Sequence, residues 1–185
     1  MDIEHFNRLT TQGLPAAVSI QIIEGKLDEK RELERLKEGK LAAEWCRSKA
    51  NRLLRPCPVW DFDPGNFHLA GDGLKVSEFN HAEHTVLFTT TSEICENLLG
   101  REWIEADPWL QTYRSKTAVI AFRWCHGLPV TPPLIAVHDG KLVVAGGNHR
   151  LRYANFCRAD RIPFLVARDQ TSRVKAMLRS ASSTE

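Results

Sequence analysis

Residues 132–152 read PPLIAVHDGKLVVAGGNHRLR, and this stretch decides the fold more than any other part of the chain. Asp139-Gly140 stands between two runs rich in β-branched residues, which is a strong hairpin signal. The pattern predicts that Leu134–Val137 and Leu142–Val144 are paired strands. A helix is predicted from Asn148 onward, directly after two glycines.

The glycine pair before this helix predicts an anion site. Glycine adopts backbone angles that are closed to other residues, and it lets a phosphate approach the main chain closely. The helix would aim its N–H groups and the positive end of its dipole at the same point. The expected phosphate or nucleotide site consists of Gly146, Gly147, Asn148, His149, Arg150 and Arg152. The alternative is that these side chains cap the helix or are solvated, without a ligand.

The order of these elements resembles the ParB/sulfiredoxin superfamily. The resemblance lies in the strand, the Asp-Gly turn, the second strand, Gly-Gly-Asn-His-Arg, the helix Leu151–Ala159 and the strand Ile162–Val166. It covers about residues 115–166, extends to residue 75 if the preceding segment belongs to the same domain, and leaves 1–74 unmatched. In that family the corresponding segment holds nucleotide phosphates.

What the resemblance implies depends on the branch of the superfamily. Free serine kinases and ParB-like domains of mobile elements, some of them described as nucleases, have a His-Arg form close to His149-Arg150. They imply a nucleoside triphosphate with Mg²⁺ as the cofactor, and phosphotransfer or NTP hydrolysis as the activity. Sulfiredoxin has its catalytic cysteine where this chain has Asn148, and an amide cannot act as a thiolate nucleophile. We therefore expect no sulfiredoxin activity.

Composition places the chain among ordinary globular proteins. Its 185 residues suit one core domain with an appendage, and 43% of them are hydrophobic and 26% charged. We expect an α/β (α+β) fold in three parts. These are an N-terminal helical segment with an irregular linker (1–74), a ParB/sulfiredoxin-like mixed-sheet domain (75–170), and a short C-terminal helix with a polar tail (171–185) that frays from Ser180. No apolar run spans a bilayer and no signal peptide is seen, so we expect a cytoplasmic protein.

The N-terminal segment shows a helical pattern after Gly13-Leu14-Pro15. Residues 24–40 contain six acids and six bases, which cancel and offer an anion no net attraction. We therefore expect this segment to serve self-association or a partner rather than the phosphate site. Its apolar face needs a cover, which is either a second copy of the chain, giving a homo-oligomer, or the chain's own second domain. That face contains Val18, Ile22, Ile23, Leu33, Leu36 and Leu41.

The middle of the chain carries further elements and the candidate acids. We expect irregular structure over 56–83, a strand over His84–Thr91 and helices over Ser92–Leu99 and Ser115–His126. Glu105 and Asp107 are the candidate catalytic carboxylates, because a phosphotransferase needs an acid near the bound phosphate to deprotonate or orient the acceptor. The alternative is that they cap the following helix or are solvated.

Other residue types give weaker signals. The five cysteines form an odd set without a Cys-x-x-Cys pair, so we expect reduced thiols and no metal site. His81 and His84 are expected to be surface residues. Between His149 and Arg179 eight bases face two acids. This excess leaves two alternative functions open: a DNA-associated protein with a basic C-terminal face, or an oligomeric interaction module with a vestigial phosphate loop.

Overall fold

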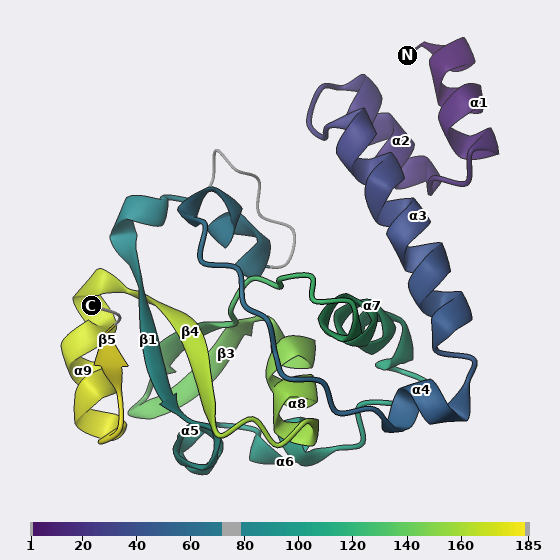
Figure 1. The fold of residues 1–185 in the computed structure, drawn as a ribbon. Coiled ribbons are helices and arrows are strands. Elements are labelled where there is room, and N and C mark those ends of the chain that lie inside the picture. The colour runs from purple at the N-terminus through teal and green to yellow at the C-terminus, as the bar shows by residue number, and fades with distance from the viewer. Residues whose placement is uncertain (1, 72–78, 184–185) are drawn as a thin grey trace.

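The computed structural model describes residues 2–71 and 79–183 of the chain (Figure 1). In this part, the protein is a mixed α/β structure with a five-stranded sheet and a helical N-terminal region. The expected boundary between residues 74 and 75 lies outside the described residues, as does the end of the polar tail. None of the helices in the described ranges is long and apolar enough to cross a bilayer.

The sheet has the strand order β3-β2-β4-β1-β5. Its strands are β1 (His84–Thr90), β2 (Leu134–His138), β3 (Lys141–Gly146), β4 (Arg161–Ala167) and β5 (Ser182–Ser183). β1 pairs antiparallel with β4 along its whole length, whereas β2 runs parallel to β4. The buried residues of β4 place this strand in the middle of the core, which agrees with the continuous apolar run predicted for it.

The predicted hairpin is confirmed. β2 and β3 pair antiparallel, with His138 opposite Lys141. The two turn residues both have positive φ, 48° at Asp139 and 72° at Gly140. Positive φ at both positions defines the tight turn whose twist matches that of the strands, and it explains why this dipeptide is a reliable hairpin signal.

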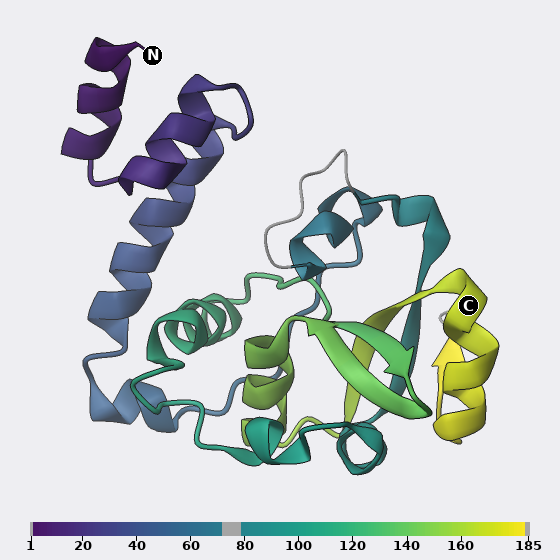
Figure 2. The ribbon, with the colours of Figure 1, turned by 180° about the vertical axis from the view of Figure 1, so that it is seen from behind.

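Helices pack around the sheet to form the body of the molecule (Figures 1 and 2). They are α5 (Thr91–Asn97), α6 (Arg101–Glu105), α7 (Arg114–Cys125), α8 (Asn148–Phe156) and α9 (Thr171–Met177), with the 3-10 turns η1 (Pro64–Ala70), η3 (His81–Glu83) and η4 (Arg168–Gln170). The main core stacks Tyr153 of α8 on Trp124 of α7, with ring centroids 5.5 Å apart. These elements confirm four predictions from the sequence. They are the strand at His84, the helices over 92–99 and 115–126, and the helix that starts at Asn148.

The N-terminal helices form an arm that leans away from the body (Figure 1). The arm consists of α1 (Ile3–Thr11), α2 (Ala16–Ile23) and α3 (Glu29–Trp45), and α4 (Lys49–Leu53) leads back to the body. The sequence predicts the first helix only after Gly13. It misses α1, although Ile3, Phe6 and Leu9 stand three residues apart on one face of this amphipathic helix. The carboxylate of Asp2 caps α1 by accepting a hydrogen bond from the N–H of His5.

The apolar face of the arm is covered mainly by the arm itself. Its small core contains Leu9, Leu14 and Ile22, with partly buried Val18, Ile23, Leu27, Leu33 and Leu36 packed against it. Farther along α3, Ala42 and Cys46 pack on Ala118 of α7. Leu41 stays 59% exposed. The arm itself, and not the chain's second domain, therefore covers most of this face; self-association stays a prediction.

The polar tail is paired and hydrogen-bonded within its described part, residues 180–183, which contradicts the fraying expected there. Ser182 and Ser183 pair with β1 as the edge strand β5. Glu93 of α5 holds the turn before this strand, because its carboxylate accepts hydrogen bonds from the backbone N–H groups of Arg179 and Ser180 and from the Ser180 hydroxyl. Glu93 is far from residues 179 and 180 in the sequence, so the composition of the polar tail could not indicate these hydrogen bonds.

Candidate functional site

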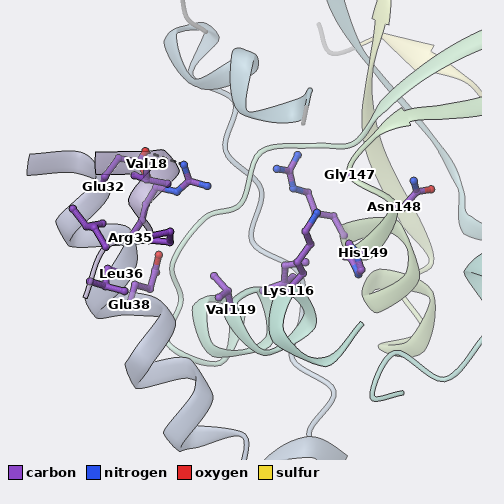
Figure 3. A pocket seen from close by; sticks show the side chains of 14 residues that line it. Val18, Glu32, Arg35, Leu36, Glu38, Lys116, Val119, Gly147, Asn148 and His149 are labelled. Carbon is purple, nitrogen blue, oxygen red and sulfur yellow. Dashed lines mark hydrogen bonds and ion pairs between the residues drawn. The ribbon is translucent and has the colours of Figure 1, made fainter. Parts of the chain in front are cut away.

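A cleft of about 430 Å³ lies between the arm and the body, where α8 begins (Figure 3). One side comes from α2, the turn before it and α3, and the other from α7 and the first turn of α8. The lining residues are Leu14, Pro15, Val18, Glu32, Arg35, Leu36, Glu38, Lys116, Val119, Ile120, Gly147, Asn148, His149 and Arg150. The structure therefore brings together four of the six residues predicted for the phosphate site.

Gly147 is the N-cap of α8 and has a φ of 84°, in the left-handed region that favours glycine. Because it is a glycine, it supplies no side chain to cap the helix. The first N–H groups of an α-helix have no acceptor inside the helix. The cleft thus opens onto a helix start whose amides and dipole favour an anion.

Gly146 does not line the cleft. It is buried, and a Cβ atom at this position would overlap the backbone carbonyl oxygen of Ala70 at the end of η1. A Cβ at Gly147 would lie 2.9 Å from the Cα of Pro133. The glycine pair therefore lets two stretches of this chain's own backbone come close, a packing role that the sequence did not show.

His149 and Arg150 lie in the wall of the cleft and are each half-buried. The imidazole of His149 meets the ring of Tyr113 edge-on, with centroids 5.7 Å apart. Nη2 of Arg150 donates a hydrogen bond to the carbonyl oxygen of Leu69 in η1. The guanidinium is therefore anchored to the body, so it combines a structural contact with a positive charge at the cleft.

Arg152 lies outside the cleft, contrary to the expectation that it joins the site. It is 1% exposed, its guanidinium carbon lies 3.7 Å from the centroid of the Tyr113 ring, and its Nε donates to the carbonyl of Trp103. Burial lowers the pKa of its guanidinium. The physical reason is helical geometry: two residues beyond Arg150, the side chain projects about 200° around the helix axis and points into the body.

Glu105 and Asp107 also lie away from Gly147. They line a second, smaller hollow of about 240 Å³, together with Arg152. The Glu105 carboxylate forms an ion pair with Arg101 at 2.7 Å, and the Asp107 carboxylate accepts a hydrogen bond from the N–H of Trp109 at 2.9 Å. Both carboxylates therefore have local structural partners, as the alternative interpretation expects.

The arm contributes charged residues that sequence reasoning missed. Glu32 of α3 pairs with Arg35 at 3.0 Å, and Glu38 pairs with Arg123 of α7 at 2.8 Å. Lys116 of α7 completes the charged lining. The charged N-terminal segment, which the sequence assigns to self-association or a partner and not to the phosphate site, lies across the cleft from α8, because α3 packs on α7 (Figure 3). The sequence shows the helical spacing of the charged residues on α3. It does not show that these residues lie near α7 and α8.

The described residues contain no group of three or more His, Cys, Asp and Glu side chains that could hold a metal ion. The two carboxylates of the cleft are each paired with a guanidinium, so this donor set does not fit a protein-held Mg²⁺ and we assign no step to that ion. Cys157 and Cys95 are poor nucleophiles, because burial raises the pKa of Cys157 to about 12 and that of Cys95 to about 11.

Several of the basic residues between His149 and Arg179 form contacts within the chain. Arg152 is buried, and Arg168 donates through Nε to the carbonyl of Ala82 at 2.7 Å. Arg161 and Lys175 donate to the hydroxyls of Ser182 and Ser183, each at 2.9 Å. These contacts stabilise the end of the fold, while Arg161, Arg168 and Lys175 remain exposed and keep their charge.

Comparisons with known proteins assign nothing to this site. No protein-family model, no curated protein and no solved structure matches the chain. What the protein does is therefore inferred from the cleft and the side chains that line it.

Proposed function

We propose that the cleft binds a phosphate-bearing small molecule, such as a nucleotide, with the phosphate at the first turn of α8. The observation that carries this proposal is the start of α8 at Gly147, a residue without a capping side chain, which opens into a cleft that three basic side chains line. These are Arg35, Lys116 and Arg150. Backbone amides and cationic side chains that converge on one cavity are the groups that bind phosphate in proteins.

The charge balance of the lining supports an anionic ligand. Three cationic side chains stand against the carboxylates of Glu32 and Glu38, and each carboxylate has a guanidinium partner. The positive end of the α8 dipole adds to the excess. A phosphate dianion would therefore enter a region of net positive potential.

The resemblance to the ParB/sulfiredoxin superfamily supports the same assignment. Its Gly-Gly-Asn-His-Arg motif, at residues 146–150, is the segment that lies at the cleft, between β3 and α8. We propose that the sheet and α8 form a domain of this type, to which the arm is added. Binding is the function proposed; transfer or hydrolysis of the phosphate needs a base that the candidate acids do not supply, because Glu105 and Asp107 line the other hollow.

Calorimetric titration with ATP and with inorganic pyrophosphate, each with and without Mg²⁺, tests this proposal. We expect saturation at one site, and about tenfold weaker binding in Lys116→Ala, because a charge-assisted hydrogen bond is lost. Lys141→Ala, an exposed lysine at the β2–β3 turn, is the matched control and should bind like the unchanged protein.

The result that would overturn the proposal is the absence of saturable binding for both probes. Equal loss of affinity in Lys116→Ala and Lys141→Ala would show a general charge effect and not a site. Titration with duplex DNA at several salt concentrations tests the alternative of a DNA-associated protein, whose affinity would fall steeply as salt is added.

A further inference from the structure

An apolar patch lies on the side of the cleft that faces α8, which also carries Glu32, Arg35 and Glu38. It is built from Leu14, Pro15, Val18 and Leu36, which belong to α2, the turn before it and α3. Figure 3 shows Val18 and Leu36 on this side and Asn148 and His149 on the other. We call these four residues the arm wall. The cleft therefore combines a cationic helix start with an apolar patch across from it.

The size of the cleft exceeds what a phosphate group alone needs. At about 430 Å³ it falls among pockets for small organic ligands, which range from about 300 to 1,000 Å³. Such pockets combine a mainly apolar lining with a few polar groups that fix orientation. Here Val119 and Ile120 of α7 add to the apolar lining, so part of the cleft is suited to an apolar part of the same ligand.

Two members of the arm wall are only half-buried although they belong to the small core of the arm. Val18 and Leu36 pack against Leu9, Leu14 and Ile22, and part of each side chain also lines the cleft. Covering this remaining apolar surface with a ligand removes it from water, which favours binding by roughly 25 cal/mol for each Å².

We infer that the arm wall selects the ligand: the cleft takes an organic phosphate monoester whose phosphate lies at the first turn of α8 and whose apolar, ring-sized body packs on Val18 and Leu36. This inference rests on the proposed function, since it needs the phosphate at α8. The arm wall is then the part of the chain that discriminates between phosphates of equal charge. The discriminating residues lie in 1–74, outside the segment that carries the family resemblance.

Titration of the unchanged full-length chain with three probes tests the inference. The probes are phenyl phosphate, glycerol 3-phosphate and inorganic phosphate. Phenyl phosphate and glycerol 3-phosphate are monoesters of similar charge, but only phenyl phosphate has an apolar ring. We expect phenyl phosphate to bind about tenfold more tightly than glycerol 3-phosphate, which corresponds to about 60 Å² of ring surface removed from water.

Val18→Thr then tests the wall itself, because threonine keeps the shape of valine and adds one hydroxyl to the apolar surface. We expect the preference for phenyl phosphate to fall at least threefold and the affinity for inorganic phosphate to stay unchanged. Val143→Thr, a half-buried valine on β3 outside the cleft, is the matched control. An unchanged circular dichroism spectrum confirms that both variants are folded.

The outcomes separate the inference from the proposal on which it rests. Saturable binding with equal affinity for phenyl phosphate and glycerol 3-phosphate would contradict ligand selection by the arm wall. It would leave the proposal of phosphate binding intact. No binding of any of the three probes would overturn both. A ring preference that survives Val18→Thr, or that Val143→Thr removes equally, would also contradict the role of the arm wall.

Discussion

Nη2 of Arg31, on α3 of the arm, lies 3.0 Å from Nε2 of His68, on η1 of the body. The other ring nitrogen of His68 lies 2.9 Å from the carbonyl oxygen of Gly65. The imidazole thus donates through Nδ1–H to Gly65 and accepts from Arg31, which requires the neutral ring. Because the next residue, Leu69, accepts from Arg150, η1 connects the arm to the start of α8.

The first prediction is that stability falls on acidification through His68. Burial, followed by the nearby charge of Arg31, lowers the pKa of His68 in the folded protein. The unfolded chain, with a pKa of about 6.5 at this residue, then binds more protons than the folded one. The contribution is therefore fully present above about pH 6.5 and is lost as the pH falls below that value. Urea unfolding at pH 7.5 and pH 5.5 measures it.

His68→Gln is the control for this pH dependence, because an amide can accept from Arg31 but does not titrate. The difference in unfolding free energy between the two pH values should be smaller in His68→Gln than in the unchanged protein. An identical difference in both would show that His68 contributes nothing.

The second prediction concerns Gly146, where an added Cβ would overlap the carbonyl of Ala70. Since the obstacle is backbone and cannot turn away, Gly146→Ala should cost at least about 3 kcal/mol of unfolding free energy. Gly39→Ala is the matched control, because nothing lies within 4 Å of that Cβ position and the residue is inside α3. It should stabilise the protein by about 0.5–1 kcal/mol. Denaturant unfolding measures both, and a harmless Gly146→Ala would contradict the close approach of η1.

The third prediction is that Arg152 is a packing residue. Arg152→Ala should cost about 3 kcal/mol, because it leaves a cavity below the ring of Tyr113. Arg152→Met, which fills a similar volume without a buried charge, should cost less than about 1.5 kcal/mol. Phosphate affinity of the folded Met variant should be unchanged. If Arg152→Met folds normally and yet loses phosphate binding, Arg152 belongs to the site after all.

The fourth prediction is that Glu93 holds the C-terminal strand. The hydroxyl of Ser180, followed by the two backbone N–H groups, lowers the pKa of Glu93, so its stabilising contribution is present above the unfolded pKa of about 4.3 and is lost as the pH falls further. At neutral pH, Glu93→Gln should speed removal of the last residues by carboxypeptidase several-fold. Glu96→Gln, an exposed acid on the same helix, is the control. Equal digestion rates in the two variants would contradict this role.

Local signals in the sequence determined the elements of the body. The hairpin at Asp139-Gly140, the helix from Asn148 and the strand that contains Ile162 were all predictable, because turn chemistry and apolar periodicity act between residues that are close in the chain. The sequence also placed four candidate residues, 147–150, where the structure has the cleft.

Only the tertiary structure decided which residues share the cleft. The sequence grouped Arg152 with Arg150 because they are two residues apart, but the turn of α8 sends Arg152 into the body. It separated the arm from the glycine loop, but α3 packs on α7 and brings Glu32, Arg35 and Leu36 across from Gly147. Contacts between distant segments depend on how whole helices pack, and a pattern within one helix shows which face is apolar but not what covers it.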